Sequence, residues 1–96
     1  MQQTTIDQIK EEILPILRAA DIKKAALFGS YVRGDYTSKS DIDILISFPE
    51  ETTLIDVAHL KYQLEEQLQK KVDLVSYNAI SHLIKDSIMK YQYPLL

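Results

Sequence analysis

The sequence contains no cysteine and no tryptophan, and among its 96 residues only two are glycine and three are proline. Without cysteine, the chain can form neither a disulfide framework nor a thiolate zinc site. Its 11 basic residues stand against 14 acidic ones, and the formal charge of -3 excludes the broad basic surface that grips a nucleic-acid polymer. No apolar run approaches the roughly 18 residues of a membrane span, and the first residues lack the pattern of a signal peptide. We therefore expect a cytoplasmic protein that contacts neither a membrane nor, directly, a nucleic-acid polymer.

Apolar residues make up 46% of the chain, which is ordinary for a globular protein. Because the sequence shows no repeat, low-complexity tract or linker, we expect one domain over residues 1–96. A domain of this size buries only about 60% of the surface that its unfolded chain exposes. It has little room to enclose a large acceptor molecule, so such an acceptor must come from outside.

Hydrophobic spacing predicts helices that alternate with short strands. Helices are expected over about residues 4–20 and 53–70 and after Asn78, and strands over residues 24–30, 41–48 and 71–77. Pro15 lies inside the first helix, so we expect a kink or a break near residues 12–14. The expected buried stripe of the second helix consists of Leu54, Val57, Leu60, Leu64 and Leu68. The predicted fold class is α/β, a single small domain with a mixed sheet of about three to four strands packed by helices.

Both glycines fall in the stretch from Leu27 to Phe48, just ahead of two aspartates that are separated by one residue. Strand alternation places Asp41 and Asp43 on one face, with Cα atoms roughly 6.6 Å apart, and the isoleucines between and after them on the other. Like charges so close raise each other's pKa unless a cation offsets them. Paired carboxylates suit Mg²⁺, which takes oxygen ligands and leaves positions for phosphate oxygens. The pair is a candidate metal platform, although an exposed strand end also tolerates two carboxylates.

Gly29 and Ser30 add a second feature, because they directly follow an apolar strand. A glycine at a strand end lets a turn bring backbone N–H groups close to an anion, and the serine hydroxyl is one more donor. The ten residues from Tyr31 to Ser40 are long enough to return the chain so that Ser30 faces the edge that carries the aspartate pair. The pair of residues predicts a phosphate-binding turn, with an ordinary solvent turn as the alternative.

Asp73 lies in the third predicted strand, between apolar residues. If that strand neighbours the one over residues 41–48, three carboxylates converge, and the third can bind metal or take a proton from an attacking hydroxyl. The alternative is an aspartate at a sheet edge that faces water. Phosphate donors together with three acidic groups indicate metal-assisted phosphoryl or nucleotidyl transfer.

The segments "FGSYVRGDYTSKSDIDIL" and "KVDLV" resemble motifs of the nucleotidyltransferase superfamily that includes DNA polymerase β. The resemblance covers nearly the whole chain and is closest to the minimal single-domain branch, the MNT proteins. It implies that Gly29, Ser30 and Arg33 bind the nucleotide, that Asp41 and Asp43 bind two Mg²⁺ ions, and that Asp73 completes the metal site and activates the acceptor. It also implies that Gly34 belongs with Arg33 to the same motif.

The same resemblance implies an activity and a partner. A hydroxyl would attack the α-phosphate of a nucleoside triphosphate, with ATP as the expected substrate and pyrophosphate as the product. Minimal members resemble MntA-type antitoxins, which pair with a HEPN-type ribonuclease toxin and silence it by adenylylating a tyrosine. We therefore expect a protein adenylyltransferase that forms a hetero-oligomer with such a toxin.

Two other functions remain open, and the intact acidic residues favour catalysis over the first of them. One is an antitoxin that neutralises its partner by binding alone, and the other is the catalytic subunit of a small-molecule nucleotidyltransferase. Arg33 has a second interpretation as a solvated loop arginine, and Lys39 is a weaker candidate phosphate contact. His59 and His82 are interpreted as helix-edge histidines and not as metal ligands. The tail from Tyr91 to Leu96 suits either a protein interface or packing against its own core.

Overall fold

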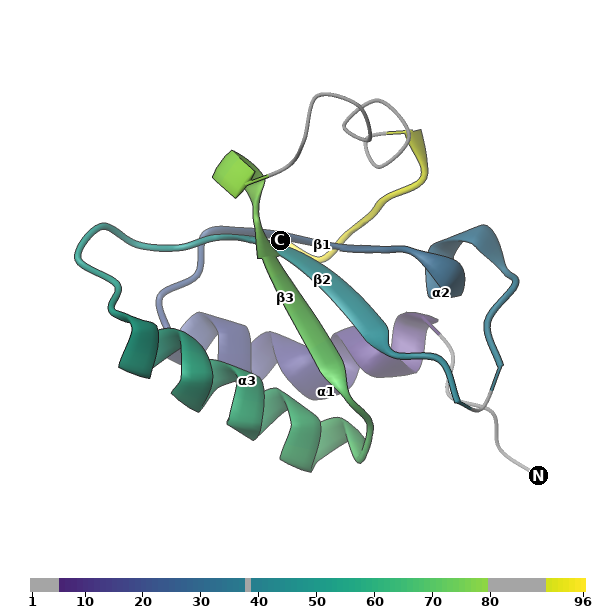
Figure 1. Ribbon diagram of the computed structural model, residues 1–96, viewed down its shortest axis with the longest axis horizontal. Helices are drawn as coiled ribbons and strands as arrows, with labels where there is room; N and C mark the ends of the chain where they lie inside the picture. The colour runs from purple at the N-terminus through teal and green to yellow at the C-terminus, as the bar shows by residue number, and fades with distance from the viewer. Residues whose placement is uncertain (1–5, 38, 80–89) are drawn as a thin grey trace.

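Two long helices lie against one face of a four-stranded sheet in the computed structural model (Figure 1), which describes residues 6–37, 39–79 and 90–96. The helices are α1 (Ile6–Ala19), α2 (Ser30–Arg33), α3 (Leu54–Leu68) and a short 3₁₀ turn, η1 (Tyr77–Ala79). The strands are β1 (Lys24–Phe28), β2 (Ile42–Ser47), β3 (Val72–Ser76) and β4 (Tyr93–Pro94). The three strands predicted from the sequence are confirmed, each within two residues of its expected ends.

The sheet is mixed and has the strand order β3-β2-β1-β4. β1 pairs antiparallel with both β2 and β4, whereas β2 pairs parallel with β3. A parallel pair needs a long crossover, and α3 provides it between β2 and β3. The predicted α/β class with a mixed sheet is therefore confirmed.

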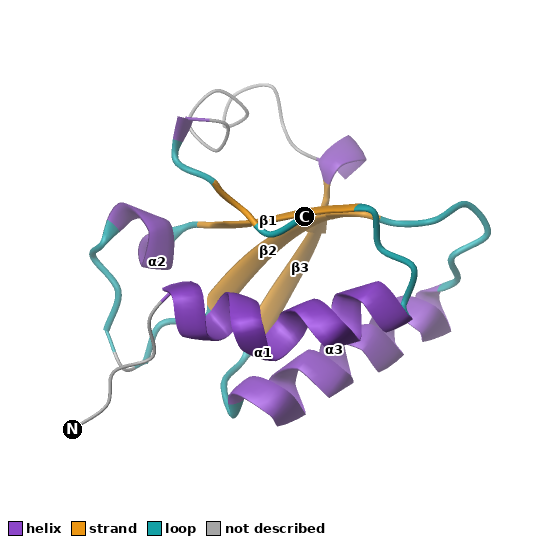
Figure 2. Cartoon of the chain, turned by 180° about the vertical axis from the view of Figure 1, so that it is seen from behind, coloured by secondary structure: helices purple, strands orange, loops and turns teal. Residues whose placement is uncertain are grey.

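The core fills the space between the sheet and the two long helices, which lie side by side beneath it (Figure 2). Ile42, Ile44 and Ile46 of β2 are fully buried in this core. Because successive side chains of a strand alternate between faces, Asp43 projects to the opposite face. The predicted alternation is confirmed, and it keeps the acidic side chain out of the helix-packed layer.

Helix α1 runs without interruption through Pro15, so a break near residues 12–14, one of the two outcomes expected there, is wrong. Ile13 and Leu17, on either side of the proline, are both fully buried, while Pro15 itself is exposed. Burial of a large aliphatic side chain stabilises by about 1.5–3 kcal/mol. Two such anchors outweigh one lost backbone hydrogen bond, which explains why the helix continues.

Helix α3 begins with a capping box, in which the hydroxyl of Thr53 accepts the N–H of Asp56 and the Asp56 carboxylate accepts the N–H of Thr53. Leu60, Leu64 and Leu68 are buried as predicted, but the assignment of Leu54 to this stripe is wrong, since it is 87% exposed. At 100° per residue, Leu54 lies about 80° from the centre of the buried stripe. Its neighbour Ile55 is 80% exposed.

The tail packs against its own chain at Tyr93 and Leu95, so for these two residues the second alternative, packing against the core, is confirmed. Tyr93 pairs with Leu27 of β1, and Leu95 is only 4% exposed. The Tyr93 hydroxyl donates to Asp7 at 2.8 Å. The helix predicted after Asn78 lies largely outside the described residues. None of the helices in the described ranges is long and apolar enough to cross a membrane.

Candidate functional site

The predicted phosphate turn lies where β1 ends and α2 begins. Gly29 has φ 78° and ψ -153°, and its carbonyl accepts the N–H groups of Val32 and Arg33 at 3.1 and 3.0 Å. The first N–H groups of a helix have no acceptor within the helix. Those of Ser30 and Tyr31 are therefore the donors that this turn can offer to an anion, together with the Ser30 hydroxyl.

Gly29 must be a glycine for two reasons. Its φ of 78° lies in the left-handed region that other residues adopt rarely. A Cβ at this position would also overlap Oδ2 of Asp43. The Asp43 carboxylate thus lies directly against the glycine turn, which explains why the glycine and the aspartate occur together.

The strand register places the predicted carboxylates at one edge. Asp43 is the partner of Phe28 across the antiparallel pair and of Asp73 across the parallel pair. Paired residues on adjacent strands present their side chains to the same face of a sheet. Asp41 immediately precedes β2 and lies on that face by alternation. The condition set from the sequence, that the strand of Asp73 neighbours the strand of Asp43, is confirmed.

This clustering changes the acidity of Asp43. The pKa of its carboxyl is raised from 3.8 to about 6 by burial first and by the negative charges of Asp73 and Asp41 second, and Arg33 acts in the opposite direction. Asp41 and Asp73 are exposed, whereas Asp43 is half-buried. At neutral pH the edge therefore carries negative charge that the neighbouring residues balance incompletely.

The donor chemistry of this edge fits Mg²⁺, because the three side chains offer only carboxylate oxygens and lack a sufficient counter-charge. In the described part of the chain, however, no group of three or more His, Cys, Asp and Glu side chains is already arranged around one point as a metal site. The exposed carboxylates of Asp41 and Asp73 would have to turn toward Asp43. Metal binding by these residues is therefore a proposal that rests on their chemistry and charge.

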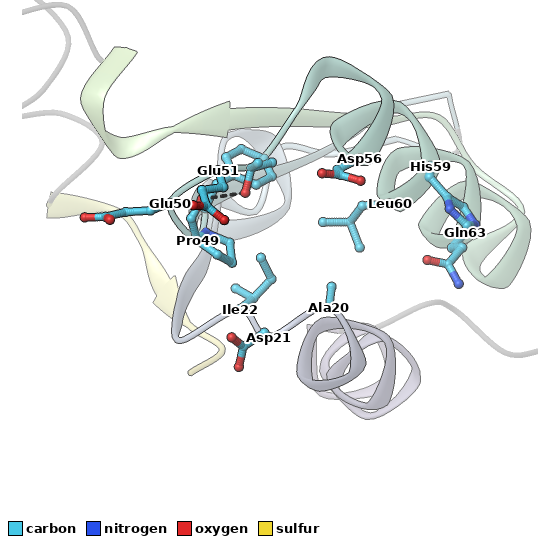
Figure 3. A pocket seen from close by; sticks show the side chains of 12 residues that line it. Ala20, Asp21, Ile22, Pro49, Glu50, Glu51, Asp56, His59, Leu60 and Gln63 are labelled. Carbon is cyan, nitrogen blue, oxygen red and sulfur yellow. Dashed lines mark hydrogen bonds between the residues drawn. The ribbon is translucent and has the colours of Figure 1, made fainter.

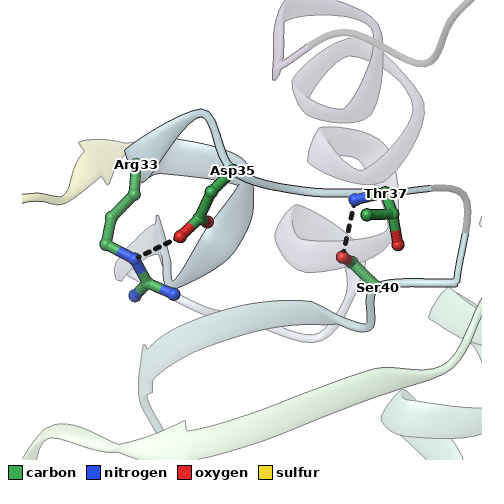
Figure 4. A network of polar contacts seen from close by, with 4 residues as sticks. All are labelled: Arg33, Asp35, Thr37 and Ser40. Atoms are coloured by element: carbon green, nitrogen blue, oxygen red, sulfur yellow. Dashed lines mark hydrogen bonds and ion pairs between the residues drawn. The ribbon is translucent and has the colours of Figure 1, made fainter.

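Arg33 ends α2 near the same edge, in a network of polar contacts (Figure 4). Its Nε donates to Oδ2 of Asp35 at 3.5 Å, and both side chains are at least half exposed. The N–H of Gly34 bonds the carbonyl of Ser30 at 2.9 Å and ends the helix in a left-handed conformation. Arg33 thus lies close enough to lower the pKa of Asp43 while its guanidinium is paired with Asp35.

The loop that returns the chain to β2 has its own local structure. Oγ of Ser40 accepts the N–H of Thr37 at 2.8 Å (Figure 4). Oγ1 of Thr37 accepts the N–H of Lys39 at 3.2 Å. These bonds form a tight polar turn just before Asp41. Among the described residues, no hydrogen bond or ion pair joins the Lys39 side chain to the acidic edge, so its role as a phosphate contact stays a prediction.

Sequence reasoning missed two features of this region. The ring of Tyr31 stacks on that of Tyr36, with centroids 4.3 Å apart and planes within 9° of parallel. A groove lined by Lys61, Glu65 and Lys71 runs beside Asp41 and Asp73. Neither feature has a periodic signal, because the stack closes a loop and the groove brings Asp41, ahead of β2, beside the end of α3 and the start of β3.

A separate cavity of about 470 Å³ lies at the opposite end of β2 (Figure 3). Its lining includes Asp21, Glu50, Glu51, Asp56 and His59, and none of the predicted site residues. Asp21 is paired with Lys23 at 2.9 Å, and Asp56 is used by the capping box of α3. This cavity is thus acidic, but its Asp21 and Asp56 carboxylates already have partners.

A phosphate-type turn that packs against strand-borne carboxylates defines the protein as a phosphoryl-transfer enzyme of the nucleotidyltransferase class. The chain belongs to the nucleotidyltransferase domain family, whose sequence profile matches residues 6–92. Both the fold class and the enzyme class expected from the sequence are therefore confirmed.

Individual relatives agree with this assignment. The chain is 49% identical over 84 residues to "Putative protein adenylyltransferase MJ0435" of Methanocaldococcus jannaschii, and the match covers 88% of this chain and 90% of that protein. It is 35% identical over 69 residues to "Protein adenylyltransferase MntA" of Thermococcus cleftensis, covering 72% of this chain and 70% of that protein.

Solved structures are similar over most of the chain. One described as a "putative minimal nucleotidyltransferase" is 31% identical and superposes with a TM-score of 0.81 over 98% of this chain and 96% of that one. A toxin–antitoxin crystal structure with AMP-PNP contains a chain that is 27% identical, with a TM-score of 0.77 over 91% of this chain and 72% of that one. The similarity to MntA-type nucleotidyltransferases that the sequence implied is confirmed.

Proposed function

We propose that this protein transfers AMP from ATP to a hydroxyl of a partner protein, a tyrosine of a HEPN-type toxin, and acts as the antitoxin of that toxin. The observation that carries the proposal is the contact of the Asp43 carboxylate with the Gly29 turn, beside Asp73. It brings phosphate donors and acidic groups to one edge of the sheet. Two relatives named as protein adenylyltransferases support a protein as the acceptor, and the toxin–antitoxin complex supports a toxin as the partner.

The reaction forms one bond and breaks one bond at phosphorus. The oxygen of the acceptor hydroxyl attacks the α-phosphorus, and the bond from that phosphorus to the oxygen that bridges the α- and β-phosphates breaks. Pyrophosphate leaves with the bonding electrons. Asp73, which is exposed, accepts the proton of the hydroxyl.

The glycine turn positions the nucleotide in this reaction. The N–H groups of Ser30 and Tyr31 and the Ser30 hydroxyl bind phosphate oxygens, and Arg33 adds a positive charge once it leaves Asp35. Mg²⁺ held by Asp41, Asp43 and Asp73 would offset the charge of the triphosphate and of these carboxylates. Holding the α-phosphate and the hydroxyl in line accounts for several kcal/mol of the barrier.

The test is intact-mass analysis of the co-expressed partner toxin. We expect the wild-type chain to add one or more AMP units to the toxin, and the Asp41→Asn variant to add none. Glu50→Gln is the matched control, because Glu50 lies in the acidic cavity at the opposite end of β2. A toxin that is silenced without any Asp41-dependent adduct would overturn catalysis.

That last result would favour the antitoxin that acts by binding alone. Efficient transfer to a free small molecule by this chain would overturn both antitoxin functions and favour the catalytic subunit of a small-molecule enzyme. These cases are distinguished in one experiment by two observations. One is whether the partner co-purifies, and the other is whether the toxin or the small molecule gains the mass of AMP.

A further inference from the structure

The stacked rings of Tyr31 and Tyr36 belong to residues on either side of Arg33, one of the candidate phosphate contacts. Tyr31 directly follows Ser30, and Tyr36 comes three residues after Arg33. The rings lie 4.3 Å apart and nearly parallel. The segment from Tyr31 to Tyr36, which contains Arg33 and directly follows the Gly29–Ser30 turn, is therefore closed at its base by one aromatic contact.

This aromatic contact is anchored in the core. Tyr31 is only 3% exposed and belongs to the same buried cluster as the isoleucines of β2. Tyr36 is partly buried and packs against that cluster. The stack therefore connects the loop after α2 to the rigid sheet and not merely to α2 itself.

Helix α2 needs such support because its own backbone hydrogen bonds are too few to keep it folded. It has four residues and is bounded by Gly29 and Gly34, both with positive φ, 78° and 89°. A single helical turn is unstable in isolation, since nucleation fixes several dihedral angles for one hydrogen bond. Glycines at both ends add backbone freedom that must be lost on ordering.

We propose that Tyr31 and Tyr36 are positioning residues for the nucleotide. Their stack fixes α2, and with it the adjoining Gly29–Ser30 turn, in the arrangement that binds phosphate before ATP arrives. A preorganised site binds more tightly, because binding energy is not consumed in ordering the loop. This inference rests on the proposed nucleotidyltransferase function, and it assigns a role to two aromatic side chains that act on the turn and not on the substrate.

The experiment measures binding of an ATP analogue with a methylene group between the α- and β-phosphates, in the presence of Mg²⁺. Tyr36→Ala removes the outer ring and is expected to weaken binding about three- to tenfold, the range that an aromatic pair supports. Tyr36→Phe keeps the ring and is expected to bind as the wild type does. The matched control is Phe48→Ala, which removes a partly buried aromatic ring from the same core at the opposite end of β2.

A second readout separates positioning from general destabilisation. Amide hydrogen exchange of residues 30–34 should be faster in Tyr36→Ala than in Phe48→Ala, at a temperature where both variants are fully folded. Equal affinity of Tyr36→Ala and Phe48→Ala for the analogue would overturn the inference alone, as would a loss in Tyr36→Phe as large as in Tyr36→Ala. A wild-type chain that binds no analogue would overturn the proposed function together with the inference.

Discussion

Carboxylates lie near both ends of β2, but the fold raises the pKa of Asp43 at one end and lowers the pKa of Asp56 near the other. At the end that carries Asp43, burial and two like charges raise the pKa of its carboxyl to about 6. At the other end, hydrogen bonds from Thr53, the backbone first and the side chain second, hold the pKa of Asp56 below its ordinary value. In the acidic cavity of Figure 3, the fold therefore stabilises Asp56 in its charged form.

The difference shows that acidity and concavity alone do not identify a functional site. Asp56 serves to start a helix, whereas Asp43 carries a charge that the fold makes unfavourable. A protein retains such an unfavourable charge where a ligand can compensate it, so a perturbed carboxylate is the stronger indicator of function.

Replacing Asp43 by asparagine is expected to have the largest effect on activity. The variant removes one negative charge from the proposed metal site, which contributes several kcal/mol of transition-state stabilisation, so transfer should fall about a thousandfold or more. The measurement is the rate of AMP transfer to the partner, with circular dichroism to verify the fold. Glu50→Gln, in the opposite cavity, should transfer normally. Near-normal transfer by Asp43→Asn with Mg²⁺ and ATP would contradict the assignment.

Alanine at Gly29 should have the next largest effect. Its Cβ would displace the Asp43 carboxylate, and a shift of about 1 Å in a catalytic group can cost about a hundredfold in rate. Gly34→Ala is the matched control: its φ of 89° is also strained, but no atom lies within 4 Å of the added Cβ. We expect Gly34→Ala to lower the unfolding temperature while reducing kcat/KM less than tenfold. Similar losses of activity in the two variants would argue against close packing of the turn on Asp43.

Alanine at Ser30 should reduce transfer moderately. It removes one hydroxyl donor and leaves the backbone N–H groups of the turn in place. A hydrogen bond to a charged group contributes on the order of 1.5–3 kcal/mol, so kcat/KM should fall roughly ten- to a hundredfold. Steady-state kinetics with varied ATP measures the effect, and a loss larger than that of Gly29→Ala would count against this model of the turn.

The smallest expected effects are on stability in metal-free buffer, and they have opposite signs at the two ends. The folded-state pKa of Asp43, about 6, lies above its ordinary value of 3.8. Ionisation therefore destabilises the folded chain progressively as pH rises from about 4 to 6, and the loss is complete above that range. After allowance for solvent screening, the loss is about 1 kcal/mol, which corresponds to about 4–8 °C in the unfolding temperature.

Asp43→Asn should accordingly melt higher than the wild type at pH 8 with a chelator, and the difference should vanish at pH 3.5. Asp56→Asn should behave in the opposite way. Because the pKa of Asp56 is lowered on folding, its carboxylate stabilises the chain above pH 3.8, and this stability is lost as pH falls through the folded-state pKa. Thermal unfolding at both pH values checks the comparison, and shifts of the same sign in the two variants would refute it.

The sequence predicted those parts of the fold and the site that depend on local pattern. Alternation in β2 separated the isoleucines from the aspartates, and the position of Gly29 at a strand end indicated a special turn. The contact between Gly29 and Asp43 was not predictable, because it depends on the antiparallel register of β1 and β2. The position of Asp73 beside Asp43 likewise depended on the strand order, which no local pattern contains.

The two errors of prediction have a common physical origin. A break at Pro15, one of the two outcomes expected there, and the burial of Leu54 were both wrong, since each expectation used only neighbours along the chain. Packing against the core decided both positions: buried residues on either side of Pro15 hold α1 together, and the buried stripe of α3 leaves Leu54, about 80° away around the helix, exposed to solvent. The Tyr31–Tyr36 stack was missed for the same reason.

The pairing of β4 with β1 has a consequence for how the molecule is made. Tyr93 pairs with Leu27, two residues before the glycine turn, and its hydroxyl bonds Asp7 in the first helix. During synthesis the strand that presents the turn therefore remains an open edge until the residues around Tyr93 have left the ribosome. β4 is therefore the last strand to join the sheet. A nascent or prematurely terminated chain that lacks it would expose the edge of β1 to pairing with other chains.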